Sequence, residues 1–140
     1  MNALKRISTR VPGLDGLLGG GLLEGGVYFI QGEPGTGKTT LANQICFGQA
    51  SEGGHALYLT LLAESHARML QHMLGHTFYD ASLVGKRITY VNGYQSLAAE
   101  GLQSVIAMLR SELARHRAAR WSSTGWCCRR RRGRTRTTLD

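Results

Sequence analysis

The residues whose types and spacing point most directly to chemistry form one glycine-rich loop. Two glycines separated by four residues are followed by a lysine and a threonine, in the order Gly32, Glu33, Pro34, Gly35, Thr36, Gly37, Lys38 and Thr39. Glycines allow tight curvature in such a loop, and successive backbone N–H groups then point inward around a phosphate. The loop therefore predicts a site for the phosphates of a nucleoside triphosphate.

The side chains at the end of this loop have separate expected roles. Lys38 can bridge the β- and γ-phosphates, which makes it a candidate catalytic residue, and the hydroxyl of Thr39 is placed to ligate Mg²⁺. Thr40 can also face the phosphates. A short pattern of this kind also arises by chance, as a glycine-rich turn with an exposed lysine. The segments on either side of the loop distinguish these two interpretations.

Those segments have the features of a strand before the loop and a helix after it. Residues 26–31 are apolar, rich in β-branched and aromatic side chains and bounded by glycine, which is typical of a strand buried on both faces. From Lys38 to about Gln49, apolar residues recur at helical spacing. Strand, loop and helix therefore follow in the order that phosphate binding requires, which favours the functional interpretation.

The same alternation continues along the chain. Strands are expected at residues 55–62 and 87–91, and helices at residues 64–74 and at about 97–117. Residues 11–26 contain several turn-forming glycines and are expected to form an ordered loop. Alternating strands and helices predict an α/β fold in which helices cover both faces of a parallel sheet.

Length and composition narrow the class of protein. A chain of 140 residues has room for one domain, and no apolar run approaches the length of a membrane span. The N-terminus lacks the apolar stretch of a secretory signal, so we expect a cytoplasmic protein with no membrane partner. The cysteines show no metal-binding spacing. His66, His72 and His76 lack a carboxylate partner for a metal ion, which favours a solvated helix face for them.

The net charge of +8 is concentrated near the end of the chain. Residues 1–120 carry 11 basic and 8 acidic side chains, whereas residues 121–140 carry 6 basic side chains and 1 acidic one. The body of the protein is therefore only mildly basic. If the arginine run over residues 129–136 is a disordered arm, it predicts non-specific binding to the phosphates of nucleic acids.

Residues ahead of the phosphate loop extend the pattern into a family resemblance. The sequence Ser8-Thr9-Arg10-Val11-Pro12-Gly13-Leu14-Asp15, followed by Leu18-Gly19-Gly20-Gly21-Leu22 and then the loop, resembles the KaiC-like ATPases of the RecA superfamily over residues 6–117. The resemblance implies a RecA-like α/β core with a mostly parallel sheet, binding of ATP with Mg²⁺, and assembly into homo-oligomeric rings. Within this segment ahead of the loop, two residues depart from the family pattern: Arg10 stands where glycine is usual and Leu23 where proline is frequent.

The resemblance also points to a candidate catalytic carboxylate. In the family the second strand ends in a pair of glutamates, one of which orients or activates the attacking water. This chain has Ala63-Glu64, which leaves Glu64 as the carboxylate for that role. A carboxylate at the C-terminal end of a strand projects into the crevice where nucleotide binds. The alternative is structural, because a glutamate at a helix N-terminus offsets the helix dipole.

One expected element is missing from the last part of the sequence. A P-loop ATPase needs an acidic residue at the end of a buried strand to hold Mg²⁺ through water. In this sequence, Asp140 is the only acidic residue after Glu112. A one-base shift through the codons of residues 120–128 allows the sequence Leu-Val-Ile-Asp-Gly-Leu-Val-Leu, which would be such a strand. We therefore hypothesise that residues 1–120 form the N-terminal part of a RecA/KaiC-like domain, incomplete at its C-terminus. Residues 121–140 would then be a basic tail that is disordered or frame-shifted.

Three functions remain open from the sequence. The first is an ATP-binding KaiC-like protein, which would be an ATPase or autokinase if its catalytic residues suffice. The second is a nucleotide-dependent module whose basic tail binds nucleic acid. The third is a gene fragment with no function of its own. The preference for ATP over GTP rests on the resemblance alone.

Overall fold

A three-stranded sheet forms the centre of the molecule. The structure is a computed structural model that describes residues 5–61, 63, 65–116 and 126–129. The strand order is β4-β3-β5, where β3 is His55–Thr60, β4 is Ile88–Asn92 and β5 is Trp126–Arg129. The middle strand, β3, pairs parallel with β4 and antiparallel with β5.

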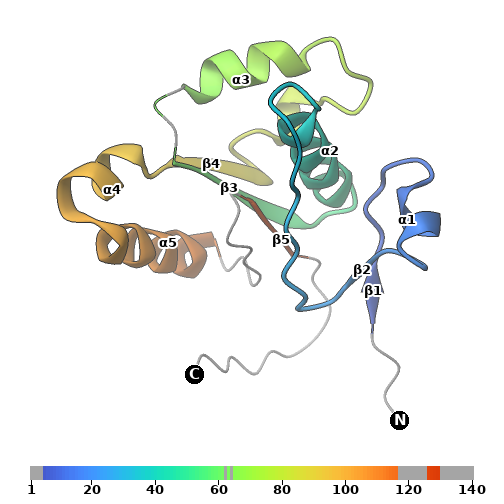
Figure 1. The fold of residues 1–140 in the computed structure, drawn as a ribbon, viewed down its shortest axis with the longest axis horizontal. Helices are drawn as coiled ribbons and strands as arrows, with labels where there is room; N and C mark the ends of the chain where they lie inside the picture. Colours follow the sequence, from blue (N-terminus) through green and yellow to red (C-terminus); the bar gives the residue numbers. More distant parts are fainter. Residues whose placement is uncertain (1–4, 62, 64, 117–125, 130–140) are drawn as a thin grey trace.

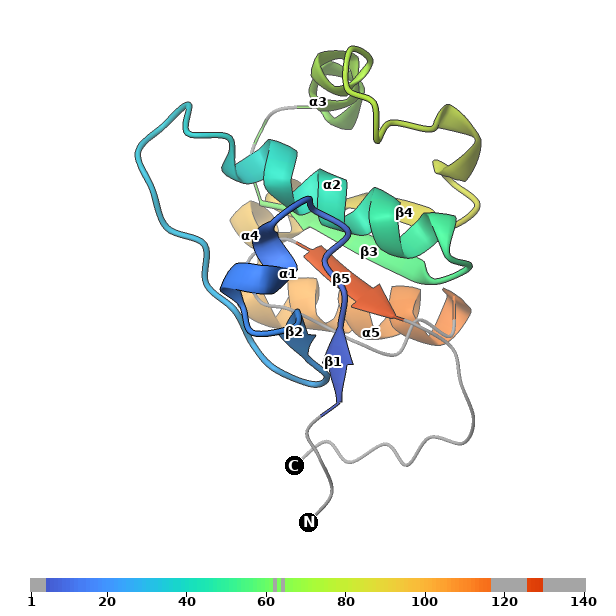
Figure 2. The same ribbon diagram turned by 90° about the vertical axis from the view of Figure 1, so that its right-hand side faces the viewer.

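Two helices enclose this sheet. Helix α2 (Lys38–Ser51) covers one face and helix α5 (Leu102–His116) covers the other, as Figures 1 and 2 show. Residues of α2 are buried along one stripe, and α5 buries Val105 and Leu109. The expected α/β fold, with helices on both sides of a small sheet, is therefore confirmed.

The alternating side chains of β3 supply both halves of the core. Successive side chains of a strand point to opposite faces of the sheet. Ala56 and Tyr58 are accordingly buried in the cluster that includes α2, whereas Leu57 is buried with Val105 and Leu109 of α5. These two sets of contacts explain why apolar side chains occupy both faces of the strand expected at residues 55–62.

Smaller elements complete the described part of the chain. Near the N-terminus, β1 (Arg6–Ile7) pairs antiparallel with β2 (Leu22–Leu23), and the short helix α1 (Leu14–Leu17) lies between them in sequence. Between β3 and β4 come helix α3 and the 3₁₀ turn η1, and helix α4 follows β4. Their bounds are His66–Met73, Ala81–Leu83 and Tyr94–Glu100.

The single helix expected at about residues 97–117 is in fact two helices. α4 ends at Glu100, α5 begins at Leu102, and Gly101 between them has φ 80° and ψ −170°. This conformation is essentially restricted to glycine. The hydroxyl of Ser104 donates to the carbonyl oxygens of Gly101 and Ser96, both at 2.9 Å, and stabilises the break. The expectation was wrong because apolar spacing continues across a glycine that the backbone uses as a corner.

The strand expected at residues 26–31 is absent, and this segment is a loop that leads from β2 to α2 (Figure 1). Val27 and Phe29 are 59% and 77% exposed. A strand needs a neighbour with which its backbone can pair, and within the described residues none lies against this segment. The local pattern is typical of a strand, but the pairing that would form it is missing.

Several expectations concern residues outside those described. Glu64, residues 121–125 and residues 130–140 fall in this group, so the division into a domain and a frame-shifted or disordered tail stays a prediction. The four residues of β5 form a strand beside β3. Among the described residues, no helix has both the length and the apolar character needed to cross a membrane.

Candidate nucleotide-binding site

The glycine-rich loop turns sharply just before α2. Gly35 and Gly37 have φ angles of 82° and 86°, a left-handed conformation that glycine adopts without steric cost. The hydroxyl of Thr36 donates a hydrogen bond of 2.8 Å to the carbonyl oxygen of Glu33, which fixes the turn. The loop therefore has the curvature that a phosphate cradle needs.

The start of α2 is suited to an anion. Its N-cap is Gly37, no described side chain caps this end, and the first turn contains no acidic residue. The first N–H groups of a helix have no partner within the helix, and the helix dipole adds partial positive charge there. The residues present therefore fit a phosphate group at this position.

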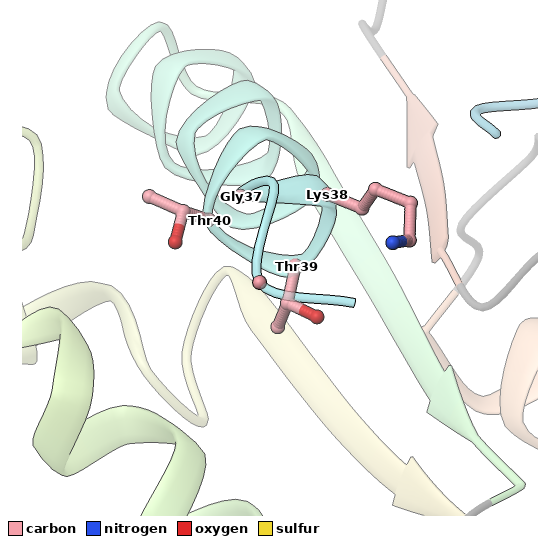
Figure 3. A pocket seen from close by; sticks show the side chains of 5 residues that line it. Gly37, Lys38, Thr39 and Thr40 are labelled. Carbon is pink, nitrogen blue, oxygen red and sulfur yellow. The ribbon is translucent and has the colours of Figure 1, made fainter. Parts of the chain in front are cut away.

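A pocket of about 250 Å³ lies at this end of the helix, lined by Gly35, Gly37, Lys38, Thr39 and Thr40. In Figure 3 the side chains of the last three extend from the start of α2 in different directions. The structure thus brings the loop backbone and these side chains to one place. Binding of ATP and Mg²⁺ by the predicted residues, from Gly32 to Thr40, stays a prediction.

Lys38 folds back over the loop. Its Nζ donates hydrogen bonds of 2.8 Å to the carbonyl oxygen of Gly32 and 2.7 Å to that of Glu33. The ammonium group is therefore held by neutral backbone oxygens. A phosphate oxygen can replace them, because a hydrogen bond between two charged groups is stronger than one to a neutral acceptor.

One carboxylate fixes the segment Ser8 to Asp15, which precedes the loop. Asp15 accepts hydrogen bonds from the Ser8 hydroxyl at 2.5 Å, the Thr9 backbone N–H at 2.8 Å and the Thr9 hydroxyl at 2.6 Å. These hydrogen bonds, first that from Ser8, lower the pKa of Asp15 below its ordinary value. Gln49 of α2 donates to the carbonyl oxygen of Ser8. The segment is thereby attached to the helix that carries the phosphate loop.

Arg10 shows how the chain accommodates its departure from the family pattern. Its φ angle is 60°, in the left-handed region that favours glycine. Its guanidinium forms an ion pair with Glu52, directly after α2, and its side chain lies over Gly48 of that helix. The left-handed backbone at position 10 therefore explains why glycine is usual there.

Asn43 and Tyr90 are candidate functional residues that the sequence analysis missed. Asn43 is fully buried, its Nδ2 donates to the carbonyl oxygen of Thr39 at 2.9 Å, and its Oδ1 accepts from the Tyr90 hydroxyl at 2.7 Å. The available signal was an asparagine on the buried stripe of α2, beside Ala42. A buried amide needs hydrogen-bond partners, and this one finds them at the site.

His66 does not lie on a solvated helix face, so that expectation was wrong for this residue. Its Nε2 lies 2.8 Å from Oγ1 of Thr60, and its ring centroid lies 5.5 Å from that of Tyr90. The first turn of α3 covers the end of β3, and the resulting burial lowers the pKa of His66. His72 and His76 are exposed. Among the described residues, no three side chains of His, Cys, Asp or Glu gather as metal ligands.

Glu64, the candidate water-activating residue, lies outside the described residues. In sequence it falls between Thr60 and His66, which are hydrogen-bonded to each other. Its catalytic role therefore stays a prediction, as does that of Lys38.

Comparison with known proteins places this geometry in a family. The family model described as "ATPase: KaiC" matches residues 7–115, which is more than half of the chain. A UPF0273 protein of Methanopyrus kandleri is 39% identical over 59 residues, covering 42% of this chain and 23% of that protein. A UPF0273 protein of Saccharolobus solfataricus is 32% identical over 77 residues, covering 55% and 27%.

A third relative has a more specific name. The DNA repair protein RadA of Rickettsia bellii is 35% identical over 108 residues, covering 76% of this chain and 21% of that protein. The chain thus matches about a quarter of the length of these curated relatives. The family match spans both the segment fixed by Asp15 and the glycine-rich loop. The chain therefore belongs to the KaiC-like ATPases, P-loop proteins of the RecA superfamily.

Proposed function

We propose that this chain binds ATP together with Mg²⁺ through the loop Gly32 to Thr39. The observation that carries the proposal is the start of α2, where a glycine loop meets a 14-residue helix. No side chain among the described residues caps this helix, and its first turn contains no acidic residue. Lys38 exchanges its backbone acceptors for phosphate oxygens, and Thr39 supplies a hydroxyl to the metal ion. Mg²⁺ neutralises charge on the phosphates when it is bound.

Isothermal titration calorimetry of ATP binding in the presence of Mg²⁺ tests this proposal. Lys38→Ala should weaken binding by at least about tenfold, because it removes a charge-assisted contact to phosphate. Lys86→Ala is a control of equal charge change, since Lys86 is exposed in the turn before β4. Equal affinities of the parent and Lys38→Ala would refute the proposed site.

Hydrolysis is a second question at the same site. We propose that Glu64 acts as the base that orients the attacking water, because it is the acidic residue that follows β3 in sequence. Glu64→Gln should then abolish phosphate release and leave ATP binding unchanged. If the parent binds ATP but releases no phosphate, the chain is a nucleotide-binding module and not an enzyme.

Nucleic acid is a second candidate ligand. Five arginines lie within residues 130–136, and one relative is named a DNA repair protein. Binding to a single-stranded oligonucleotide should then weaken steeply with added salt, because basic side chains release counterions from the phosphates. A variant with these five arginines replaced by serine is the control. Affinity that does not change with salt would refute this candidate.

A homo-oligomeric ring, which membership of the family suggests, is a separate proposal. Light scattering after gel filtration, with and without ATP and Mg²⁺, tests it. A monomer under both conditions would refute it.

A further inference from the structure

The side chain of Asn43 connects the first turn of α2 to the sheet. Its Nδ2 donates to the carbonyl oxygen of Thr39, and its Oδ1 accepts from the hydroxyl of Tyr90 on β4. Asn43 has no exposed surface, so water does not replace either partner. A buried polar network whose members are all satisfied is rigid and holds its parts in place.

The carbonyl group that Asn43 holds belongs to the residue expected to ligate the metal ion. Thr39 lies in the first turn of α2, and its side chain is exposed beside the pocket (Figure 3). Within the described part of the chain, its hydroxyl makes no hydrogen bond. The backbone of Thr39 is thus held from the core side, while its hydroxyl is accessible from the pocket.

Further contacts fix the position of this amide. The ring of Tyr58 on β3 packs against that of Tyr90, with centroids 5.3 Å apart. Nδ2 of Asn43 lies 3.8 Å from the sulfur of Met69 on α3. Residues of β4 and α3 therefore contact the side chain that holds Thr39, and Tyr58 of β3 supports Tyr90.

We propose that Asn43 and Tyr90 are positioning residues for metal-bound nucleotide: by fixing the backbone of Thr39, they set where its hydroxyl meets Mg²⁺. The inference rests on the proposed function, and neither residue itself contacts nucleotide or metal. Residues that orient a metal ligand from behind change metal affinity by about 10- to 100-fold when they are removed.

The test measures ATP affinity with and without Mg²⁺ and needs no turnover. The dissociation constant in EDTA divided by that in Mg²⁺ isolates the contribution of the metal ion. Tyr90→Phe keeps the ring and removes the hydroxyl, so this ratio should fall about tenfold while affinity in EDTA changes little. An equal loss of affinity with and without Mg²⁺ would overturn the inference in favour of a purely structural role.

Tyr79→Phe is the matched control. The Tyr79 ring packs against Phe47, with centroids 5.2 Å apart, and among the described residues its hydroxyl has no hydrogen-bond partner. This variant should keep the parental ratio. A fall equal to that of Tyr90→Phe would overturn the inference, because the effect would then come from loosening the core.

Two further variants test whether the effect passes through Thr39. Asn43→Leu replaces the amide by an apolar side chain of similar size and should lower the ratio as Tyr90→Phe does. In a Thr39→Ala background, Tyr90→Phe should have no further effect on the ratio. A full effect of Tyr90→Phe in that background would show that Tyr90 acts elsewhere, and the inference would be wrong.

Failure of this inference can be separated from failure of the proposed function. If Lys38→Ala binds ATP as tightly as the parent, the proposed site is wrong, and this inference is wrong with it. If Lys38→Ala loses binding but Tyr90→Phe keeps the parental ratio, only the positioning role is wrong.

Discussion

The side chain of Arg10 lies so close to Gly48 of α2 that only glycine fits at position 48. A methyl group added to Gly48 would overlap Cβ of Arg10 and come within 3.0 Å of its Cγ. Cβ cannot rotate away as the end of a long side chain can. We therefore expect Gly48→Ala to lower the free energy of unfolding by about 1–3 kcal/mol, the usual cost of overpacking, as measured by urea denaturation.

Replacing Arg10 by glycine should reverse this effect. Arg10→Gly removes both clashing atoms, so Gly48→Ala in that background should stabilise α2 by up to about 1 kcal/mol through its higher helix propensity. Gly16→Ala in α1 is a control. Apart from its chain neighbours and the backbone of α1, no atom of the described residues lies within 4 Å of the added methyl group. Simple additivity of the two substitutions would contradict the contact.

Gly101 should not tolerate a side chain, although there is space for one. Apart from its chain neighbours, no atom of the described residues lies within 4 Å of a methyl group added there, but φ is 80° and ψ is −170°. The cost of Gly101→Ala is therefore purely conformational, and we expect it to be about 1–3 kcal/mol in the free energy of unfolding. A stabilised variant with higher helix content would instead show that α4 and α5 can merge into one helix.

Asp15 should make stability dependent on pH in the acidic range. Hydrogen bonds from Ser8 and Thr9 lower its pKa in the folded state, from an ordinary value of 3.8. The unfolded state then takes up a proton at a higher pH than the folded state does. The stabilisation is thus complete above the unfolded pKa and is lost as pH falls through the folded pKa.

Asp15→Asn tests this dependence. The variant should be less stable than the parent by about 1 kcal/mol at pH 7, a modest value because the carboxylate is partly exposed. This difference should shrink as pH falls below 4, measured by urea denaturation. A difference that stays constant down to pH 2.5 would mean that the charge of Asp15 is not what stabilises the segment.

His66 should make stability depend on pH in a higher range than Asp15 does. Burial lowers its pKa from an ordinary value of 6.5, so the unfolded state takes up a proton first as pH falls. The folded state is therefore destabilised progressively below about pH 6.5, until His66 is also protonated in the folded protein. Melting temperatures between pH 7.5 and 5.5 should fall less for His66→Gln than for the parent. His72→Gln, exposed on the same helix, should behave like the parent.

The loop and α2 could be predicted from the sequence because the information that specifies them is local. Glycines at fixed spacing specify the turn, and apolar residues at helical spacing specify the buried side of α2. The segment at residues 26–31 shows the limit of this reasoning. Its composition is typical of a strand, but a strand exists only where another strand pairs with it, and residue types do not encode that pairing.

The polar residues behind the site were unpredictable for a related reason. Asn43 and Tyr90 are 47 positions apart in sequence, and only the packing of α2 on the sheet brings them together. His66 was expected to be solvated because α3 alone does not reveal that its first turn covers the end of β3. The break at Gly101, in contrast, has a signal in the sequence, because a glycine interrupts the apolar repeat there.

The central position of β3 in the sheet determines how its amide protons exchange with solvent. This strand pairs on both edges and contributes to both core clusters, so its amide protons exchange with solvent only when the whole domain unfolds. Within the described residues, the loop before α2 has no such pairing, so its amide protons exchange through small local fluctuations. Exchange rates at these two places therefore report separate free energies, and a ligand that slows exchange only in the loop has ordered the phosphate cradle without stabilising the rest of the fold.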